Sequence, residues 1–310
     1  MSNNYLWCER YAPKSISECI LPDELKVKFQ NFVDNKSVPN LILAGGPGVG
    51  KTTVAKALCE ELGADMMFMN ASSERGIDEV RTKMFGFAST TSLVGGKKIL
   101  ILDEADNLTP DAQKALRAAI EELQNNCSFV MTCNYKNKLI PALHSRCTVI
   151  DFTMAKAQRP KMAAKFFERL CNILDENLVT YEKKVVAKII EMYFPDYRRA
   201  INELQTLSSS GVIDASALSQ VSSVGVKELI PLLRDKNFKE VRKWTVDNLD
   251  NDVNEIIMSC YHDLYEKLKP ESIGEAVMVM AEHQYRAAFV VDQELNLNAM
   301  FLQLMQLEYK

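Results

Sequence analysis

Gly45-Gly46-Pro47-Gly48-Val49-Gly50-Lys51-Thr52-Thr53 fits the phosphate-binding loop pattern G-x-x-x-x-G-K-[ST]. The apolar run at 40–44 before it is typical of a buried parallel strand, and 54–62 after it is typical of a helix that Gly63 ends. Glycines let backbone amides surround phosphate oxygens, and the helix N-terminus adds a partial positive charge. The pattern therefore predicts a bound nucleotide, and a glycine-rich turn without a ligand is the alternative.

Two side chains in this loop have expected tasks. Lys51 is long enough to reach the terminal phosphates, and the Thr52 hydroxyl is a suitable ligand for Mg²⁺ beside them. The full predicted contact set on the loop is Gly46, Pro47, Gly48, Val49, Gly50, Lys51, Thr52 and Thr53.

Polar side chains also follow two later strands. The apolar run at 97–104 ends in Asp103 and Glu104, which is the Walker B pattern. We expect Asp103 to hold Mg²⁺ through water and Glu104 to orient or deprotonate an attacking water. Asn134 follows the strand predicted at 128–133 and would face the γ-phosphate if that strand lies beside the Asp103 strand. An ordinary turn asparagine is the alternative.

Strands and helices alternate up to residue 152, which predicts an α/β fold with a parallel sheet. The second strand, at 66–70, is expected to be buried, and residues 153–310 are expected to be entirely helical. We predict three domains: a nucleotide-binding domain at 1–152, a small helical lid at 153–224 and an all-α collar at 225–310. A self-contained bundle without an assembly role is the alternative for the last domain.

Composition narrows the function classes. The 310 residues are 47% hydrophobic and 25% charged, which is ordinary for a soluble globular protein. A net charge of −4 argues against a protein that coats nucleic acid through bulk charge. The eight cysteines form no C-x-x-C pair, so we expect reduced thiols and neither a disulfide framework nor a zinc site. No apolar run approaches the roughly 18 residues of a membrane span, and the first residues do not form a signal peptide, so we expect a cytoplasmic protein without a membrane partner.

The spacing of the sequence alone does not assign a role to two groups of residues. The stretch 7–13 precedes any clear element, and its aromatic residues either pack on a nucleotide base or form an arm packed on the core. The three histidines, His144, His262 and His283, are isolated in the sequence, and we expect them to be structural.

Further motifs resemble those of the AAA+ clamp-loader family along nearly the whole chain. Residues 7–13, WCERYAP, resemble its W-x-E-K-Y-R-P element, with Ala12 in place of the usual arginine. Residues 70–77, NASSERGI, are similar to the N-A-S-D-E-R-G-I run of archaeal and eukaryotic small subunits, with Ser73 in place of aspartate. Residues 145–147 match the S-R-C motif, and 195–202 resemble the G-D-x-R-R-A-L-N sensor element. The size, the missing zinc cysteines and the segments 18–22, ECILP, and 194–196, FPD, look most like the larger, ATPase subunit of T-even-type phage loaders.

The resemblance implies roles that spacing does not assign. It implies that Asn134 is the first sensor of the γ-phosphate and that Arg198, on the lid, is the second. It implies that Arg146 is an arginine finger acting on ATP held by a neighbouring subunit, which would explain an arginine on a loop without an obvious partner. A surface salt bridge is the alternative for Arg146. The implied adenine pocket consists of Cys8, Glu9, Arg10, Tyr11 and Ile20.

The resemblance also implies partners. The expected protein is an ATP- and Mg²⁺-dependent ATPase that loads a DNA polymerase sliding clamp onto primer–template DNA, working in the bacterial host cytoplasm as a phage protein. Four copies of the chain would join one smaller subunit in a ring. ATP binding would join the subunits and open the clamp, and hydrolysis, stimulated by DNA and clamp, would release the clamp closed around DNA.

Contacts with DNA have to be local in an acidic chain. The helix N-termini near Gly76 and Thr109 could offer amides to phosphates. The region 81–93, with Phe85 and Phe87, is a candidate clamp contact, and core packing is the alternative. Gln113 and Arg117 could couple the nucleotide pocket to the DNA side. The DNA-contact candidates are Arg75, Gly76, Ile77, Arg81, Lys83 and Lys114, each with a solvated surface position as the alternative.

Three competing functions deserve comparison. The string Asp103-Glu104-Ala105-Asp106 spells the D-E-A-D motif of a helicase class, but those enzymes need a second RecA-like domain that 153–310 does not predict. Other AAA+ motors, of the branch-migration or initiator type, normally append a DNA-reading domain that we do not see. A ring subunit that binds ATP without hydrolysing it is disfavoured because the polar residues of a hydrolytic site are all present.

Overall fold

The computed structural model describes residues 5–72, 77–90, 98–214 and 226–310. The chain divides into two compact units, Met1–Ala217 and Leu218–Lys310, each of which is described by itself. The domain boundary predicted at 224 falls in the segment 215–225, outside the described residues.

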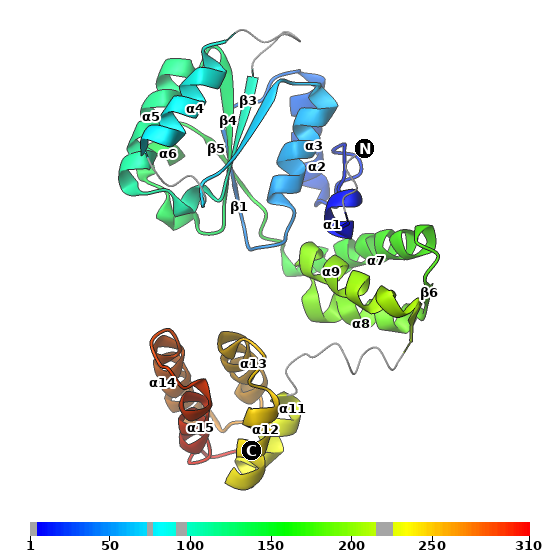
Figure 1. The fold of residues 1–310 in the computed structure, drawn as a ribbon, viewed down its shortest axis with the longest axis vertical. Helices are drawn as coiled ribbons and strands as arrows, with labels where there is room; N and C mark the ends of the chain where they lie inside the picture. The colour runs from blue at the N-terminus through cyan, green and yellow to red at the C-terminus, as the bar shows by residue number, and fades with distance from the viewer. Residues whose placement is uncertain (1–4, 73–76, 91–97, 215–225) are drawn as a thin grey trace. The chain divides into compact units, whose positions relative to one another are not determined.

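The first unit contains a parallel sheet, as predicted, and this sheet has five strands. Its strand order is β2-β3-β4-β1-β5, and every neighbouring pair is parallel. Because β4 lies between β3 and β1, the strand that precedes Asn134 is flanked by the Asp103 strand and by the strand before the phosphate-binding loop (Figure 1). The strands are β1 (Leu41–Ala44), β2 (Met66–Asn70), β3 (Lys98–Asp103), β4 (Cys127–Cys133) and β5 (Thr148–Asp151).

Helices cover both faces of this sheet (Figure 1). Successive side chains of a strand point to opposite faces. Leu100 therefore packs into the core under α4 and α5, whereas Ile99 packs into the core under α2 and α3. The central strands are buried on both sides, which explains their continuous apolar runs. The helices are α2 (Asp23–Asp34) and α3 (Lys51–Leu62) on one face, and α4 (Ile77–Ala88), α5 (Pro110–Leu123) and α6 (Pro141–His144) on the other.

Strand β2 departs from the prediction of a buried strand. Met69 is buried, but Met66 and Phe68 are 41% and 40% exposed. The physical reason is that β2 is an edge strand of the sheet. Helix α3 reaches this edge through Lys56, whose Nζ lies 4.3 Å from the centroid of the Phe68 ring.

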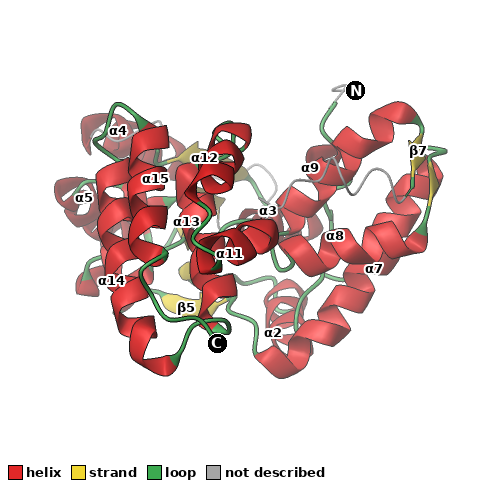
Figure 2. Cartoon of the chain, turned by 90° about the horizontal axis from the view of Figure 1, so that it is seen from below, coloured by secondary structure: helices red, strands yellow, loops and turns green. Residues whose placement is uncertain are grey.

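Within residues 153–214, which the structure describes, the lid part of the first unit contains three α-helices and two unpredicted strands. Helices α7 (Arg159–Glu176), α8 (Lys183–Tyr193) and α9 (Tyr197–Leu207) carry the expected apolar stripes. The expectation that everything after residue 152 is helical is wrong, because β6 (Thr180–Tyr181) and β7 (Val212–Ile213) pair in parallel. Figure 2 shows β7 near the ends of the lid helices. Two-residue strands are too short to produce an alternating pattern in the sequence.

Short helical turns complete the first unit. Helix α1 (Trp7–Arg10) lies in a stretch where no element was expected, and its four residues are too few for a periodic signal. The 3₁₀ turns are η1 (Ala105–Asn107), η2 (Lys136–Lys138), η3 (Lys156–Gln158) and η4 (Ser208–Ser210).

In the described residues 226–310 the second unit is a bundle of α-helices (Figure 2), and its own apolar core includes Trp244 and Phe301. His283 is fully buried, and its Nδ1 lies 2.8 Å from Asn296 Oδ1, so this histidine is structural but not isolated. None of the helices in the described ranges has the length and apolarity to cross a membrane. The helices are α11 (Val226–Arg234), α12 (Phe238–Asp247), α13 (Val253–Tyr265), α14 (Pro270–Ala287) and α15 (Gln293–Leu304).

Candidate functional site

The phosphate-binding loop joins β1 to α3, and α3 begins at Lys51. Gly48 and Gly50 have φ values of 69° and 90°, a backbone region that residues with a Cβ rarely adopt. The glycines at these two places are therefore required by the turn that brings the chain from the strand end into the helix. This is the strand–loop–helix context that the motif predicts.

Lys51 lies at the centre of the loop, with only 7% of its surface exposed. Its Nζ donates hydrogen bonds to Gly45 O at 2.8 Å, Gly46 O at 2.7 Å and Asn134 Oδ1 at 2.9 Å. All three acceptors are neutral, and burial lowers the pKa of the Lys51 ammonium. An anionic phosphate oxygen is a better partner for this buried cation than any of the three.

The predicted metal ligands lie together at the carboxyl ends of the strands. Thr52 Oγ1 donates to Asp103 Oδ1 at 2.5 Å, and Thr132 Oγ1 donates to the same oxygen at 2.7 Å. Hydroxyl and carboxylate oxygens are the ligands that Mg²⁺ prefers. The donor set of Thr52 and Asp103 therefore fits the expected ion.

Glu104 has an unusual backbone conformation for a residue with a side chain. Its φ is 55°, in the left-handed region, which is uncommon outside glycine and tends to occur at functional sites. The Glu104 amide donates to Thr132 Oγ1 at 3.0 Å, and Asn107 Nδ2 donates to its carboxylate at 3.2 Å. Thr132, which sequence reasoning missed, thus holds both Walker B acids in place.

Asn134 is held by a second residue that the sequence analysis did not single out. Asp106 is 8% exposed, and its carboxylate accepts from the amides of Asn134 at 3.3 Å and Tyr135 at 3.2 Å. This fixes the turn after β4 so that the Asn134 side chain reaches Lys51. The sequence signal for this role is that Asp106 is an acid three residues after Asp103, within the D-E-A-D string.

The lid touches the phosphate-binding loop directly. The Tyr197 amide donates to Gly48 O at 3.1 Å, and a Cβ placed on Gly48 would lie 1.8 Å from Asp196 Oδ1. Asp196 caps α9 by accepting from the Arg199 amide at 2.9 Å. Burial is the main cause of the lowered pKa of Lys51, and the charge of Arg198, the second residue of α9, lowers it further.

The N-terminal segment is fastened to the lid. Arg169 on α7 donates to Tyr11 O at 2.6 Å and to Glu18 O at 3.0 Å, although it lies 158 residues from Tyr11 in the sequence. Gln205 on α9 accepts from the Trp7 amide at 2.8 Å. Sequence reasoning missed both Arg169 and Gln205 because neither belongs to a motif.

The residues of the expected adenine pocket lie on this fastened segment. Cys8, Tyr11 and Ile20 are half-buried, whereas Glu9 and Arg10 are exposed. Burial raises the pKa of the Cys8 thiol, Glu9 adds to the rise, and the Arg198 guanidinium opposes it. Arg198 is therefore within electrostatic reach of both Cys8 and Lys51, as a lid residue beside a nucleotide would be.

Arg146 lies at the opposite edge of the sheet. It precedes β5, whose first residue, Thr148, pairs with Leu41 at the start of β1. The phosphate-binding loop follows Ala44, at the other end of β1. Arg146 therefore lies where the strands begin, which we call the amino edge of the sheet, whereas Lys51 lies where the strands end, at the carboxyl edge.

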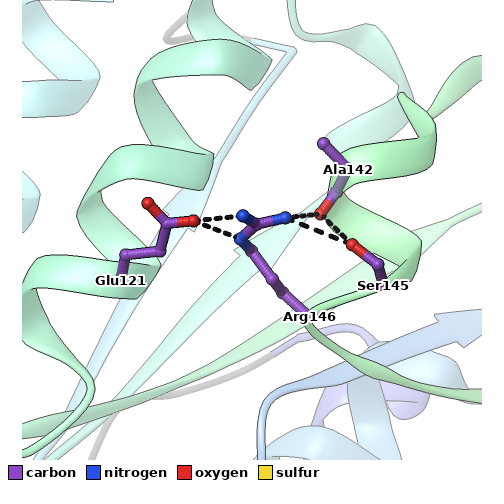
Figure 3. A network of polar contacts seen from close by, with 4 residues as sticks. All are labelled: Glu121, Ala142, Ser145 and Arg146. Atoms are coloured by element: carbon purple, nitrogen blue, oxygen red, sulfur yellow. Dashed lines mark hydrogen bonds and ion pairs between the residues drawn. The ribbon is translucent and has the colours of Figure 1, made fainter.

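The expectation that Arg146 lacks a partner within the chain is wrong. Its Nε donates to Glu121 Oε1 on α5 at 2.6 Å, and its Nη2 pairs with the same carboxylate (Figure 3). Its Nη1 donates to Ala142 O at 3.0 Å and to Ser145 Oγ at 3.2 Å. A cavity of about 450 Å³, which Arg146 helps to line, opens here at the amino ends of β1, β4 and β5.

The DNA-contact candidates are not brought into one site by the described residues. Arg75 and Gly76 lie outside the described residues, as does the Arg81 side chain, while Ile77 begins α4, which also carries Lys83. Lys114 is exposed and pairs with Asp111 at 2.9 Å. At the start of α5, Thr109 Oγ1 accepts from the Ala112 amide at 3.3 Å, so this amide is already occupied.

The predicted clamp edge and the coupling helix have more definite structural roles. Phe85 and Phe87 pack against the core, which favours the alternative given for them, and Leu93 lies outside the described residues. Gln113 is 2% exposed; it accepts from the Ile140 amide at 2.8 Å and donates to Lys138 O at 3.1 Å. It therefore ties α5 to the segment between Asn134 and Arg146.

Comparison with known proteins gives a consistent family. Residues 41–155 match the model of the ATPase family associated with various cellular activities (AAA), and 158–219 match the model of the sliding-clamp-loader large subunit, AAA+ ATPase lid domain. The sliding-clamp-loader large subunit of Enterobacteria phage T4 is 34% identical over 96% of this chain and 94% of its own length. The replication factor C small subunit of Archaeoglobus fulgidus is 37% identical over 78% of both chains.

A solved structure extends the likeness to the fold. The Holliday junction branch migration motor RuvB of Thermotoga maritima has a TM-score of 0.53 and 19% identity, covering 67% of this chain and 71% of that one. At this identity the likeness concerns the fold alone.

Proposed function

The chain belongs to the sliding-clamp-loader family of AAA+ ATPases, and from this premise we propose that it hydrolyses ATP to place a sliding clamp on primer–template DNA during DNA replication. It acts with copies of itself: four copies and one smaller loader subunit form the ring. The clamp and the primed DNA each stimulate hydrolysis. The protein works in the cytoplasm of the host cell.

The observation that supports the proposed assembly is that Lys51 and Arg146 lie at opposite ends of the strands of the sheet. An arginine at the amino edge is on the wrong side to serve the nucleotide of its own chain. In a ring of similarly oriented copies, the amino edge of one sheet faces the carboxyl edge of the next. Arg146 then completes the neighbour's site, where a finger of this kind contributes about 10³–10⁵ in rate.

The chain's own residues prepare the other half of that site. The Lys51 ammonium exchanges its neutral acceptors for oxygens of the β- and γ-phosphates. Asn134, placed by Asp106, lies beside that ammonium and contacts the γ-phosphate or the attacking water. Glu104, at the end of β3, orients this water and accepts its proton. The Arg198 guanidinium closes over the phosphates from the lid.

Thr52 and Asp103 would hold the magnesium ion, which supplies charge neutralisation on the phosphates. The base of the nucleotide would lie against the segment of Cys8, Tyr11 and Ile20, which the lid holds through Arg169. Lid position and nucleotide occupancy are thereby linked.

The test is a reconstituted loading assay. The chain, the smaller loader subunit and the clamp are combined with a primed DNA circle, and ATP hydrolysis and clamp retention on the DNA are measured together. We expect hydrolysis to rise with the clamp and with primed DNA, to be highest when both are present, and to be accompanied by clamp retained on the DNA. A hydrolysis rate indifferent to both additions, with no clamp retained, would contradict the proposal.

A further inference from the structure

All three nitrogens of the Arg146 guanidinium have a partner within the chain itself, and two of them face Glu121. Nε and Nη2 face the Glu121 carboxylate, and Nη1 faces Ala142 O and Ser145 Oγ (Figure 3). The N–H groups of Nε and Nη2 that face Glu121 are therefore already in use when a phosphate oxygen approaches from a neighbouring chain. The carboxylate has to leave, at least in part, before a phosphate can accept from the same N–H groups.

The exposure and the chemistry of the Arg146–Glu121 ion pair favour the replacement of Glu121 by another anion. The side chains of Arg146 and Glu121 are 32% and 47% exposed, so the pair is partly hydrated on a surface that is open to another molecule. Exposed ion pairs change an equilibrium by up to about fivefold, because water screens them and both side chains lose freedom. A guanidinium donates paired hydrogen bonds to a carboxylate and to a phosphate alike, so a phosphate is a chemically equivalent replacement for the Glu121 carboxylate.

We propose that Glu121 is a positioning residue which holds the Arg146 guanidinium within its own chain and is exchanged for the γ-phosphate of the neighbour's ATP when subunits join. The proposal rests on the trans role of Arg146 given above. Glu121 has two consequences: it keeps the finger extended toward the amino edge, and it weakens ATP-dependent assembly by competing with the phosphate. A subunit joint that forms with ATP and opens after hydrolysis benefits from such a competitor.

The decisive variant is Glu121→Gln, which keeps the length and a hydrogen-bond acceptor but removes the charge. The matched control is Glu122→Gln, because Glu122 is the adjacent exposed carboxylate on α5 and its loss changes the net charge equally. Each variant is assembled as full chain with the smaller subunit. The association constant is measured by analytical ultracentrifugation in a non-hydrolysable ATP analogue and in ADP.

We expect Glu121→Gln to strengthen association about two- to fivefold in the ATP analogue and to leave it unchanged in ADP, which lacks the phosphate that Arg146 would contact. Glu122→Gln should match the wild type in both nucleotides. In an Arg146→Ala background, Glu121→Gln should have no effect on association, because its only route of action has been removed. Glu121→Asp, which restores the charge, should return toward the wild-type value.

Three outcomes overturn the proposal. Weaker association of Glu121→Gln in the ATP analogue would make Glu121 a contact with the neighbour. An equal effect of Glu121→Gln and Glu122→Gln would show that only the net charge of the chain matters. An effect of Glu121→Gln that persists with Arg146→Ala would show that Glu121 acts through a residue other than Arg146. Failure of the function proposed above looks different: wild-type subunits would then associate equally in the ATP analogue and in ADP, and Arg146→Ala would change neither.

Discussion

The two edges of the same sheet are built in opposite ways. At the carboxyl edge, Lys51 donates to Asn134 at 2.9 Å, and Asp103 accepts from Thr52 at 2.5 Å and from Thr132 at 2.7 Å, all in partly buried positions. At the amino edge, Arg146 is a partly exposed cation held by one surface carboxylate beside an open cavity. The first edge has its geometry set before any ligand arrives. The second edge holds its charge loosely, as suits a contact that forms and breaks.

The largest expected effect tests whether the edges act on different nucleotides. Arg146→Ala should lower hydrolysis by the assembled complex about 10³–10⁵-fold, because transition-state charge is no longer neutralised. ATP binding by the isolated chain should be unchanged, whereas Lys51→Ala should abolish it. The measurement is steady-state hydrolysis beside equilibrium ATP binding.

Mixing the two variants sharpens this result. Complexes that contain both chains should recover part of the activity, because an intact Arg146 on a Lys51→Ala chain completes the site of an Arg146→Ala neighbour. Absence of any recovery in mixed complexes of verified composition would mean that both residues serve the same nucleotide.

Arg169→Gln tests the fastening of the N-terminal segment to the lid. The variant loses charged hydrogen bonds to Tyr11 O and Glu18 O, and we expect ATP affinity to fall about tenfold. Affinity for inorganic tripolyphosphate, which has no base, should stay at the wild-type value. Arg159→Gln, on the same helix but exposed, is the control. Equal losses for ATP and tripolyphosphate would assign Arg169 to the phosphates instead of the base.

Gly48→Ala tests the rigidity of the carboxyl edge. The new Cβ meets Asp196 Oδ1 at 1.8 Å, and a φ of 69° costs a residue with a side chain about 1–2 kcal/mol. The urea midpoint of the first unit should therefore fall. Gly46→Ala is the control for stability, because a Cβ there meets nothing within 4 Å. If both variants unfold at the same urea concentration, the contact between loop and lid is not tight in solution.

The smallest expected effect is a change in stability in alkaline solution, and it concerns one buried thiol at each edge of the sheet. Burial raises the pKa of Cys133, at the carboxyl edge, and of Cys147, at the amino edge, to about 11 from an ordinary value of 9.0. Below pH 9 both thiols stay protonated whether the chain is folded or unfolded, so they contribute no pH dependence. Between pH 9 and about 11 the unfolded chain loses protons that the folded chain keeps, and stability falls. Cys133→Ala and Cys147→Ala should each flatten this alkaline decline in urea titrations at successive pH values, and slopes identical to wild type would show that the thiols are more hydrated than their burial indicates.

Sequence reasoning was most successful where the chain carries local, periodic signals. The sheet strands, the Thr109 cap of α5 and the loop around Lys51 depend on neighbours in sequence, and the structure has them where they were expected. The placement of Asp103 beside Thr52 followed from one rule, that parallel strands end at a common edge.

What was missed depends on distant neighbours. The exposure of Phe68 follows from the strand order, which no local pattern encodes. The contacts of Arg169 with Tyr11 and of Arg146 with Glu121 span 158 and 25 residues and involve ordinary surface residue types. Such residues carry no signature until folding brings their partners beside them.

The location of Arg146 gives the molecule a direction. A chain that offers a finger at one edge and receives one at the other joins its copies head to tail, through two different surfaces. A row of such copies has one end whose nucleotide site receives no finger and another end whose finger faces no nucleotide. In the proposed ring, a partner that supplies an arginine but needs no ATP of its own would complete the first end, and the unpaired finger at the other end would mark a break between neighbours.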